Sequence, residues 1–149
     1  MSLVLTFSRR YCTGVSVIAD TISKRLNIPV YGKDYICKDI HNKEDIEKQN
    51  ETIRNLAQES CIIIGRGASE ALKEQRNVIN IYVYADKEDR IKRAMKKENI
   101  SKEEAIKRVK EVDTERIEYY EKNTGKFWGD MDGYDIILDS SKYGIENCA

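Results

Sequence analysis

Three polar segments of the sequence carry residue types suited to binding phosphate groups. The first, "SRRYCTGVS" at residues 8–16, follows the apolar run "LVLTF" and precedes a helical pattern. A glycine-containing loop between a strand and a helix can hold phosphate oxygens on the backbone N–H groups at the helix N-terminus. The segment therefore indicates either an anion site or an ordinary structural turn.

This first segment keeps part of the P-loop pattern G-x-x-x-x-G-K-[ST]. Gly14 occupies the second glycine position, and Ser16 occupies the position of the hydroxyl that binds Mg²⁺. Val15 stands in place of the lysine, and Arg9 stands in place of the first glycine. Because the lysine is missing, Arg9 or Arg10 could supply the cation that pairs with phosphate.

The other two segments are rich in arginine. Arg66 lies between two glycines in "GRGA", directly after the apolar run "CIIIG", where it could bind an anion or form a surface ion pair. Arg90 and Arg93 are three residues apart and share one face of a predicted helix. Asp113 and Arg116 have the same spacing, so they could either orient a phosphate-binding guanidinium or form a salt bridge within the helix.

Apolar, β-rich runs alternate with helical patterns along the chain. We expect strands at 3–7, 28–32, 61–65, 78–85 and 134–141, and helices at 17–26, 43–59, 68–75, 87–98 and 101–122. Strands that are apolar throughout and alternate with helices are typical of an α/β fold with a parallel sheet and helices on both faces. Sites in such sheets lie beyond the carboxyl ends of the strands, where the polar segments follow.

Composition narrows the possible functions. The length of 149 residues suits one domain over residues 1–149. Lys+Arg and Asp+Glu are equal at 26 each, which gives no overall basic surface for nucleic acid. No apolar stretch approaches the ~20 residues that cross a membrane, and no signal peptide is apparent, so we expect a cytoplasmic protein. The four cysteines form no CxxC pair, which disfavours a zinc site.

Several segments in this order resemble the cytidylate kinase-like family, whose members are related to P-loop nucleoside monophosphate kinases. They are "FSRRYCTG", "IADTISKRLNIPVYGKD", "CIIIGRGA", "YVYADKEDRIKR" and "VDTERIEYYEKNTGKFWGDMDGYDIILDSS". The resemblance covers most of the chain. It implies a three-layer α/β/α fold with a parallel five-stranded sheet. It also implies a helical lid over about residues 88–122 and a shortened acceptor-binding region over about residues 33–50.

The resemblance also implies an activity, the transfer of the γ-phosphoryl group of ATP to a nucleoside monophosphate such as (d)CMP, with Mg²⁺. The implied catalytic residues are Arg90, Arg93, Asp113 and Arg116. The implied nucleotide- and phosphate-binding residues are Arg9, Arg10, Thr13, Gly14, Val15, Ser16, Arg66 and Ser140, with Ser16 also binding Mg²⁺. Such transfer depends mainly on positioning and charge stabilisation, so arginines matter more than an acid–base pair.

Two other functions stay open at this point. The chain could be a kinase-derived protein that binds a nucleotide or another anion without turnover. It could also be an interaction protein that uses its polar helices as a partner surface. The sequence does not define the oligomeric state.

Overall fold

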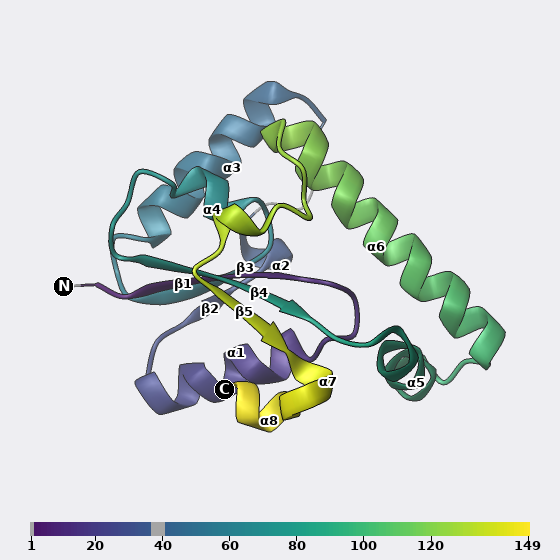
Figure 1. The fold of residues 1–149 in the computed structure, drawn as a ribbon. Coiled ribbons are helices and arrows are strands. Elements are labelled where there is room, and N and C mark those ends of the chain that lie inside the picture. Colours follow the sequence, from purple (N-terminus) through teal and green to yellow (C-terminus); the bar gives the residue numbers. More distant parts are fainter. Residues whose placement is uncertain (1, 37–40) are drawn as a thin grey trace.

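Five strands form one parallel sheet in the order β2-β3-β1-β4-β5 (Figure 1). The computed structural model describes residues 2–36 and 41–149. Its strands are β1 (Val4–Arg9), β2 (Val30–Tyr31), β3 (Cys61–Ile64), β4 (Val78–Tyr84) and β5 (Ile136–Asp139). A strand thus lies within or across each of the five predicted ranges, and the parallel five-stranded sheet is confirmed.

Helices connect the strands and follow the last of them. They are α1 (Val15–Leu26), α2 (Lys33–Ile36), α3 (Lys43–Leu56), α4 (Ala68–Ala71), α5 (Lys87–Glu98), α6 (Lys102–Thr124), α7 (Ser140–Tyr143) and α8 (Ile145–Cys148). At the start of α6, the Ser101 hydroxyl accepts the Glu104 N–H at 3.2 Å, and the Glu104 carboxylate accepts the Ser101 N–H at 3.1 Å. These two bonds satisfy N–H groups that a helix start leaves unpaired, as the spacing of the two residues predicts.

The expectation of a strand over 134–141 is wrong at its end. The strand β5 stops at Asp139, and α7 begins at Ser140. The Asp139 carboxylate accepts the backbone N–H groups of Ser141 and Lys142 at 3.0 and 3.3 Å. A carboxylate at this position caps a helix start, so the chain turns instead of extending.

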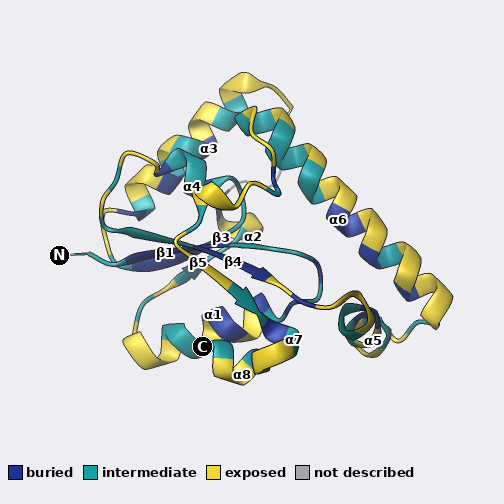
Figure 2. Ribbon diagram, viewed as in Figure 1, coloured by how far each residue is buried: buried dark blue, intermediate teal, exposed yellow. Residues whose placement is uncertain are grey.

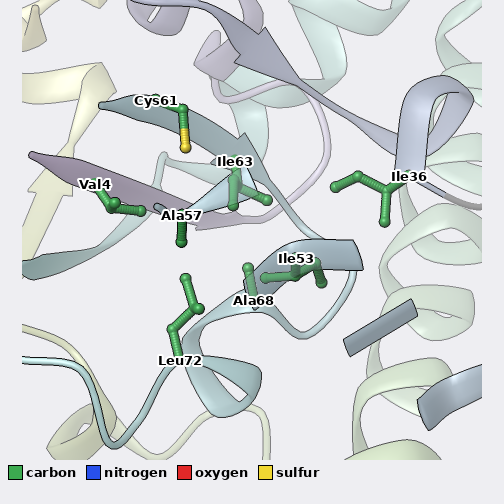
Figure 3. Close-up of a cluster of buried hydrophobic side chains, with 8 residues drawn as sticks. All are labelled: Val4, Ile36, Ile53, Ala57, Cys61, Ile63, Ala68 and Leu72. Atoms are coloured by element: carbon green, nitrogen blue, oxygen red, sulfur yellow. The ribbon is translucent and has the colours of Figure 1, made fainter. Parts of the chain in front are cut away.

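Buried residues lie along the strands and on the inward sides of the helices (Figure 2). One cluster packs α3 and α4 on the sheet and is drawn in Figure 3; it comprises Val4, Ile36, Ile53, Ala57, Cys61, Ile63, Ala68 and Leu72. A second cluster packs α1 on the opposite face and includes Phe7, Val15 and Ile18. The three-layer α/β/α architecture is therefore confirmed.

The strand order creates a crevice at the carboxyl-terminal end of the sheet. The chain leaves β1 toward β2 and leaves β3 toward β4, on opposite sides of the β1–β3 pair. The carboxyl ends of these two strands form a topological switch point, where ligands bind in open α/β sheets. The helices α5 and α6 stand beyond this edge (Figure 1). None of the helices in the described residues is both long and apolar enough to cross a membrane.

Tyr11 anchors the loop after β1 to the α5–α6 pair. Its ring is 7% exposed and belongs to a third core cluster, with Ile91 and Ala94 of α5 and Ala105 and Val109 of α6. The loop is therefore held between the sheet and this helix pair, so α5 and α6 help to fix its shape.

Candidate active site

The loop after β1 has the backbone of an anion-binding turn. Gly14 precedes α1 with a φ of +86°, and a Cβ there would lie 2.6 Å from side-chain atoms of Ile145. Cys12 has a φ of +61°, a conformation that costs a residue with a Cβ roughly 1–2 kcal/mol. No side chain caps the start of α1, so its first N–H groups remain available to an anion.

The position of the missing lysine contributes to the core instead. Val15 is 4% exposed and belongs to the same buried cluster as Phe7 and Ile18. Thr13 is also buried, and its hydroxyl donates to the Arg10 carbonyl at 3.1 Å, which closes the turn. The loop therefore keeps its shape without supplying a cation at residue 15.

Two cavities meet at this loop. The strand-end cavity, of about 570 Å³, lies beyond β1 and β3 and is lined by residues that include Gly65, Arg66, Tyr119 and Trp128. The helix-start cavity, of about 590 Å³, lies beside the start of α1 and α5 and is lined by residues that include Arg10, Gly14, Arg93 and Lys97. Both are lined by Arg9, Tyr11, Ser16 and Arg116, which we call the junction of the two cavities.

We call three residues the junction arginines: Arg9 and Arg116, which line both cavities, and Arg66, which lines the strand-end cavity alone. Their charges have no carboxylate partner in the part of the chain that the structure describes. Within the described residues, no Asp or Glu oxygen lies within 4.0 Å of their side-chain nitrogens. Burial lowers the pKa of Arg9 to about 9, helped by the charges of Arg116 and Arg66. Burial likewise lowers the pKa of Arg116. Since arginine stays protonated, these pKa shifts express the cost of burying the two charges and, at Arg9, the further cost of placing them near like charges. A bound anion would offset this cost.

Two structural features bring these guanidiniums together. A Cβ on Gly65 would lie 2.7 Å from the Arg9 Nη1, so a glycine lets the Arg9 side chain lie against the turn after β3. The Arg116 Nη1 donates to the Arg9 carbonyl at 3.3 Å, which ties α6 to the end of β1. The end of β1, the turn after β3 and the helix α6 are distant in sequence, yet they place their guanidiniums together at the carboxyl ends of the strands.

Arg66 has a conformation that few side chains adopt. Its φ is +59°, between the positive φ values of Gly65 and Gly67. Its Nε donates to the Gln49 side-chain oxygen at 3.2 Å, and its guanidinium carbon lies 4.3 Å from the centroid of the Tyr119 ring. Instead of a surface ion pair, the side chain has an amide and an aromatic partner, which leave its charge uncompensated.

The Asp113 side chain ties the helix pair to the loop. One carboxylate oxygen lies 2.6 Å from Arg90 Nη1, and the other accepts the Tyr11 N–H at 2.8 Å. The alternative of a salt bridge within α6 is wrong, because the partner of Asp113 is Arg90 on α5 and not Arg116. Arg90 lines neither cavity, so the structure places it behind the loop.

Arg93 joins the same loop to the end of β5. Its Nη1 donates to the Cys12 carbonyl and to the Ser140 hydroxyl, each at 3.1 Å, and its Nη2 donates to the Ser140 carbonyl at 3.3 Å. Ser140 is fully buried and lines neither cavity. It therefore supports Arg93, which itself lines the helix-start cavity.

Several residues at the site were not singled out from the sequence as binding groups. Gln49 is a polar residue on the mostly polar helix α3, yet it is only 2% exposed. Its burial follows from the tertiary packing and has no signal in the sequence. Trp128 is 4% exposed, lines the strand-end cavity and has the Arg10 guanidinium 4.8 Å from its ring centroid. Phe127, its neighbour, is 71% exposed.

The described residues contain no group of three or more His, Cys, Asp or Glu side chains placed to hold a metal ion. Mg²⁺ keeps several waters and binds phosphate oxygens with only one or two protein ligands. The exposed Ser16 side chain at the junction fits such a role, because a metal bound there would be held mostly by the nucleotide.

Known proteins share the fold of this chain. The chain is 23% identical to a cytidylate kinase from Methanocaldococcus jannaschii, with 97% of this chain and 92% of that protein covered. An uncharacterized protein from Eubacterium ventriosum has a structure that matches with a TM-score of 0.89 at 27% identity, covering 97% and 92% of the two chains. A shikimate kinase from Bacteroides thetaiotaomicron matches with a TM-score of 0.59 at 11% identity, covering 98% and 93%, which shows a shared fold.

A model of one protein family matches residues 40–142, well over half of the chain. The match spans the turn after β3, both helices α5 and α6, and the strand β5. The chain belongs to the cytidylate kinase-like family.

Proposed function

We propose that the protein is a nucleotide kinase that transfers the γ-phosphoryl group of ATP to a nucleoside monophosphate, with (d)CMP as the first candidate. The observation that carries this proposal is the set of junction arginines. Three guanidiniums that have no carboxylate partner among the described residues line the two cavities, and those of Arg9 and Arg116 lie where the cavities meet. Family membership and the relative from Methanocaldococcus jannaschii support the choice of a cytidine phosphate.

The helix-start cavity suits the triphosphate of ATP. Its lining contains six cationic side chains and no carboxylate; the six are Arg9, Arg10, Arg93, Lys96, Lys97 and Arg116. The backbone N–H groups at the start of α1 add hydrogen-bond donors for phosphate oxygens. Ser16 would hold Mg²⁺, which neutralises charge on the β- and γ-phosphates when it is bound with the nucleotide.

The strand-end cavity would hold the acceptor, with its phosphate facing Arg66. The donor and the acceptor would then approach each other at the junction, in line for transfer of the phosphoryl group. The transition state spreads negative charge over oxygens, and the guanidiniums of Arg9 and Arg116 would stabilise that charge. No general base is needed, because the reaction depends on positioning and charge.

The helices α5 and α6 would form the lid of this site and exclude water from the transfer. In this role Arg90 and Asp113 act as positioning residues, since they hold the loop and do not line a cavity. Arg93 both supports the loop and faces the donor cavity. Ser140 acts on the nucleotide through Arg93.

One observation favours a second candidate function, the binding of a nucleotide or another anion without turnover. Val15 replaces the lysine of the P-loop and is buried in the core, so no lysine reaches the phosphates from that position. Under this alternative the junction arginines bind an anion but do not promote its transfer.

A single assay separates the two functions. ADP formation is measured with ATP and Mg²⁺ across a set of nucleoside monophosphates, with ATP binding measured in parallel by calorimetry. We expect ADP formation that rises when (d)CMP is added. ATP binding with the same low ADP release in every mixture would contradict the kinase and favour the binding protein.

A further inference from the structure

Gln49 forms two hydrogen bonds with Arg66. Its Nε2 donates to the Arg66 carbonyl at 2.9 Å, while its Oε1 accepts from the Arg66 Nε at 3.2 Å. The amide therefore holds the backbone and the side chain of the same arginine. With only 2% of Gln49 exposed, water does not compete effectively for these bonds.

Tyr119 completes the arrangement from α6. Its hydroxyl lies 2.8 Å from the Gln49 Nε2 and 3.1 Å from the Gln49 Oε1, and its ring stacks on the Arg66 guanidinium. A glutamine has two acceptor sites on its oxygen and two N–H donors, and all four have a partner in this arrangement. An ionised glutamate would place an acceptor against the Arg66 carbonyl, so the amide is the matching group.

These contacts leave the ligand-facing part of Arg66 available. A guanidinium has five N–H donors, and Gln49 uses the one on Nε. Among the described residues, the four on the terminal nitrogens have no hydrogen-bond partner, and Arg66 lines the strand-end cavity. The left-handed backbone of Arg66, held by the bond from Gln49, sets the direction of this side chain.

We infer that Gln49 and Tyr119 are positioning residues that fix the Arg66 guanidinium for the phosphate of the acceptor. The two side chains come from α3 and α6, so the site depends on how these helices dock on the turn after β3. A guanidinium held in advance loses less conformational freedom when an anion binds, which increases affinity. This inference rests on the proposed function, because it assigns Arg66 to the acceptor.

A double-mutant cycle tests this inference. Binding of CMP is measured for the wild type, Gln49→Met, Arg66→Ala and the double variant, with inorganic phosphate as a second probe. The signal is the fluorescence of Trp128, the only tryptophan, which lines the strand-end cavity. Gln49→Met should weaken CMP binding roughly tenfold in the wild type, the effect of losing hydrogen bonds to a charged group. In the Arg66→Ala background the effect should be less than about twofold.

Two controls keep the cycle interpretable. Asn55→Met replaces an exposed amide on the same helix and should leave CMP affinity unchanged. If Gln49→Met does not fold, Tyr119→Phe takes its place, since it keeps the stacking ring and removes only the hydroxyl. We expect Tyr119→Phe to weaken CMP binding roughly threefold, about the effect of losing one neutral hydrogen bond. This weakening should occur when Arg66 is present and be absent in Arg66→Ala.

Different outcomes would overturn the positioning role of Gln49 and the proposed kinase activity. Equal weakening by Gln49→Met with and without Arg66 would overturn the positioning role, because a merely structural residue acts regardless of its neighbour. A wild type that binds CMP or phosphate but forms no ADP would contradict the kinase, while the cycle would still decide the role of Gln49. Failure of both probes to bind would overturn the inference.

Discussion

Two groups of arginines lie at the same edge of the sheet and differ in their partners. Arg90 and Arg93 donate to a carboxylate, a hydroxyl and backbone carbonyls, and they hold the loop after β1. The junction arginines have no carboxylate within reach in the described chain, and they line the cavities. Proximity to the carboxyl ends of the strands therefore does not make an arginine a ligand group. Arg90 is paired with Asp113 and lines neither cavity, whereas Arg93 has no carboxylate partner among the described residues and faces the helix-start cavity.

The largest expected effect follows from removing one junction arginine. Arg116→Ala should lower the rate of ADP formation roughly 10³-fold, the lower end of the effect of an arginine that stabilises phosphoryl transfer. Its thermal midpoint should not fall, because relief of repulsion with Arg9 offsets the loss of two contacts. These are the 3.3 Å bond to the Arg9 carbonyl and the contact with the Tyr11 ring.

Arg76 provides the matched control for this variant. It is exposed and lines neither cavity, so Arg76→Ala should retain the wild-type rate. A rate of Arg116→Ala within about threefold of the control would show that the junction arginines are not the charges that act in transfer.

Asp113→Ala should differ from Arg116→Ala in that it lowers the stability of the folded protein. It leaves Arg90 without its partner, with 12% of the Arg90 side chain exposed, and it leaves the Tyr11 N–H without its acceptor. Breaking a buried ion pair in this way costs about 3 kcal/mol. Urea unfolding of Asp113→Ala and the wild type measures this difference. An unchanged urea midpoint would show that the pairing of Arg90 with Asp113 does not stabilise the fold, so the two groups of arginines would not differ in this way.

Anion binding should stabilise the folded protein through the junction arginines. Phosphate at 100 times its dissociation constant should add about 2.7 kcal/mol to the free energy of unfolding, seen as a higher thermal midpoint. Arg9→Gln should lose most of this gain, while sodium chloride at equal ionic strength serves as the control for screening. The same gain in Arg9→Gln and the wild type would place the anion elsewhere.

The smallest expected effect comes from the strained loop. Cys12→Gly removes the cost of a Cβ at a φ of +61° but increases the freedom of the unfolded chain. The balance should stabilise the protein by about 0.5–1 kcal/mol. Chemical denaturation tests the sign, and a destabilised variant would show that the packing of the Cys12 side chain outweighs the backbone strain.

Much of the fold follows from local sequence patterns. The apolar run at residues 61–65 and the paired hydrogen bonds of Ser101 and Glu104 at the start of α6 act through neighbouring residues, so they specify their elements directly. The start of α7 was missed because the Asp139 side chain caps a helix of only four residues, too short for a periodic pattern. The acceptor-binding region expected over 33–50 includes residues 37–40, which lie outside the described residues.

The site is only partly predictable in the same way. The rule that ligands bind beyond the carboxyl ends of parallel strands brings Arg9 and Arg66 to one edge. The pairing of Asp113 with Arg90 and the contact of Gln49 with Arg66 span 23 and 17 residues. Such contacts depend on how α3, α5 and α6 dock, which residue spacing within one helix does not encode.

The most direct measurement is a crystal structure of the protein soaked with CMP and a non-hydrolysable ATP analogue in the presence of Mg²⁺. The account predicts phosphate oxygens within hydrogen-bond distance, roughly 2.7–3.2 Å, of the guanidinium nitrogens of Arg9, Arg66 and Arg116. Phosphates bound away from the junction, with these three side chains directed into solvent, would contradict the account.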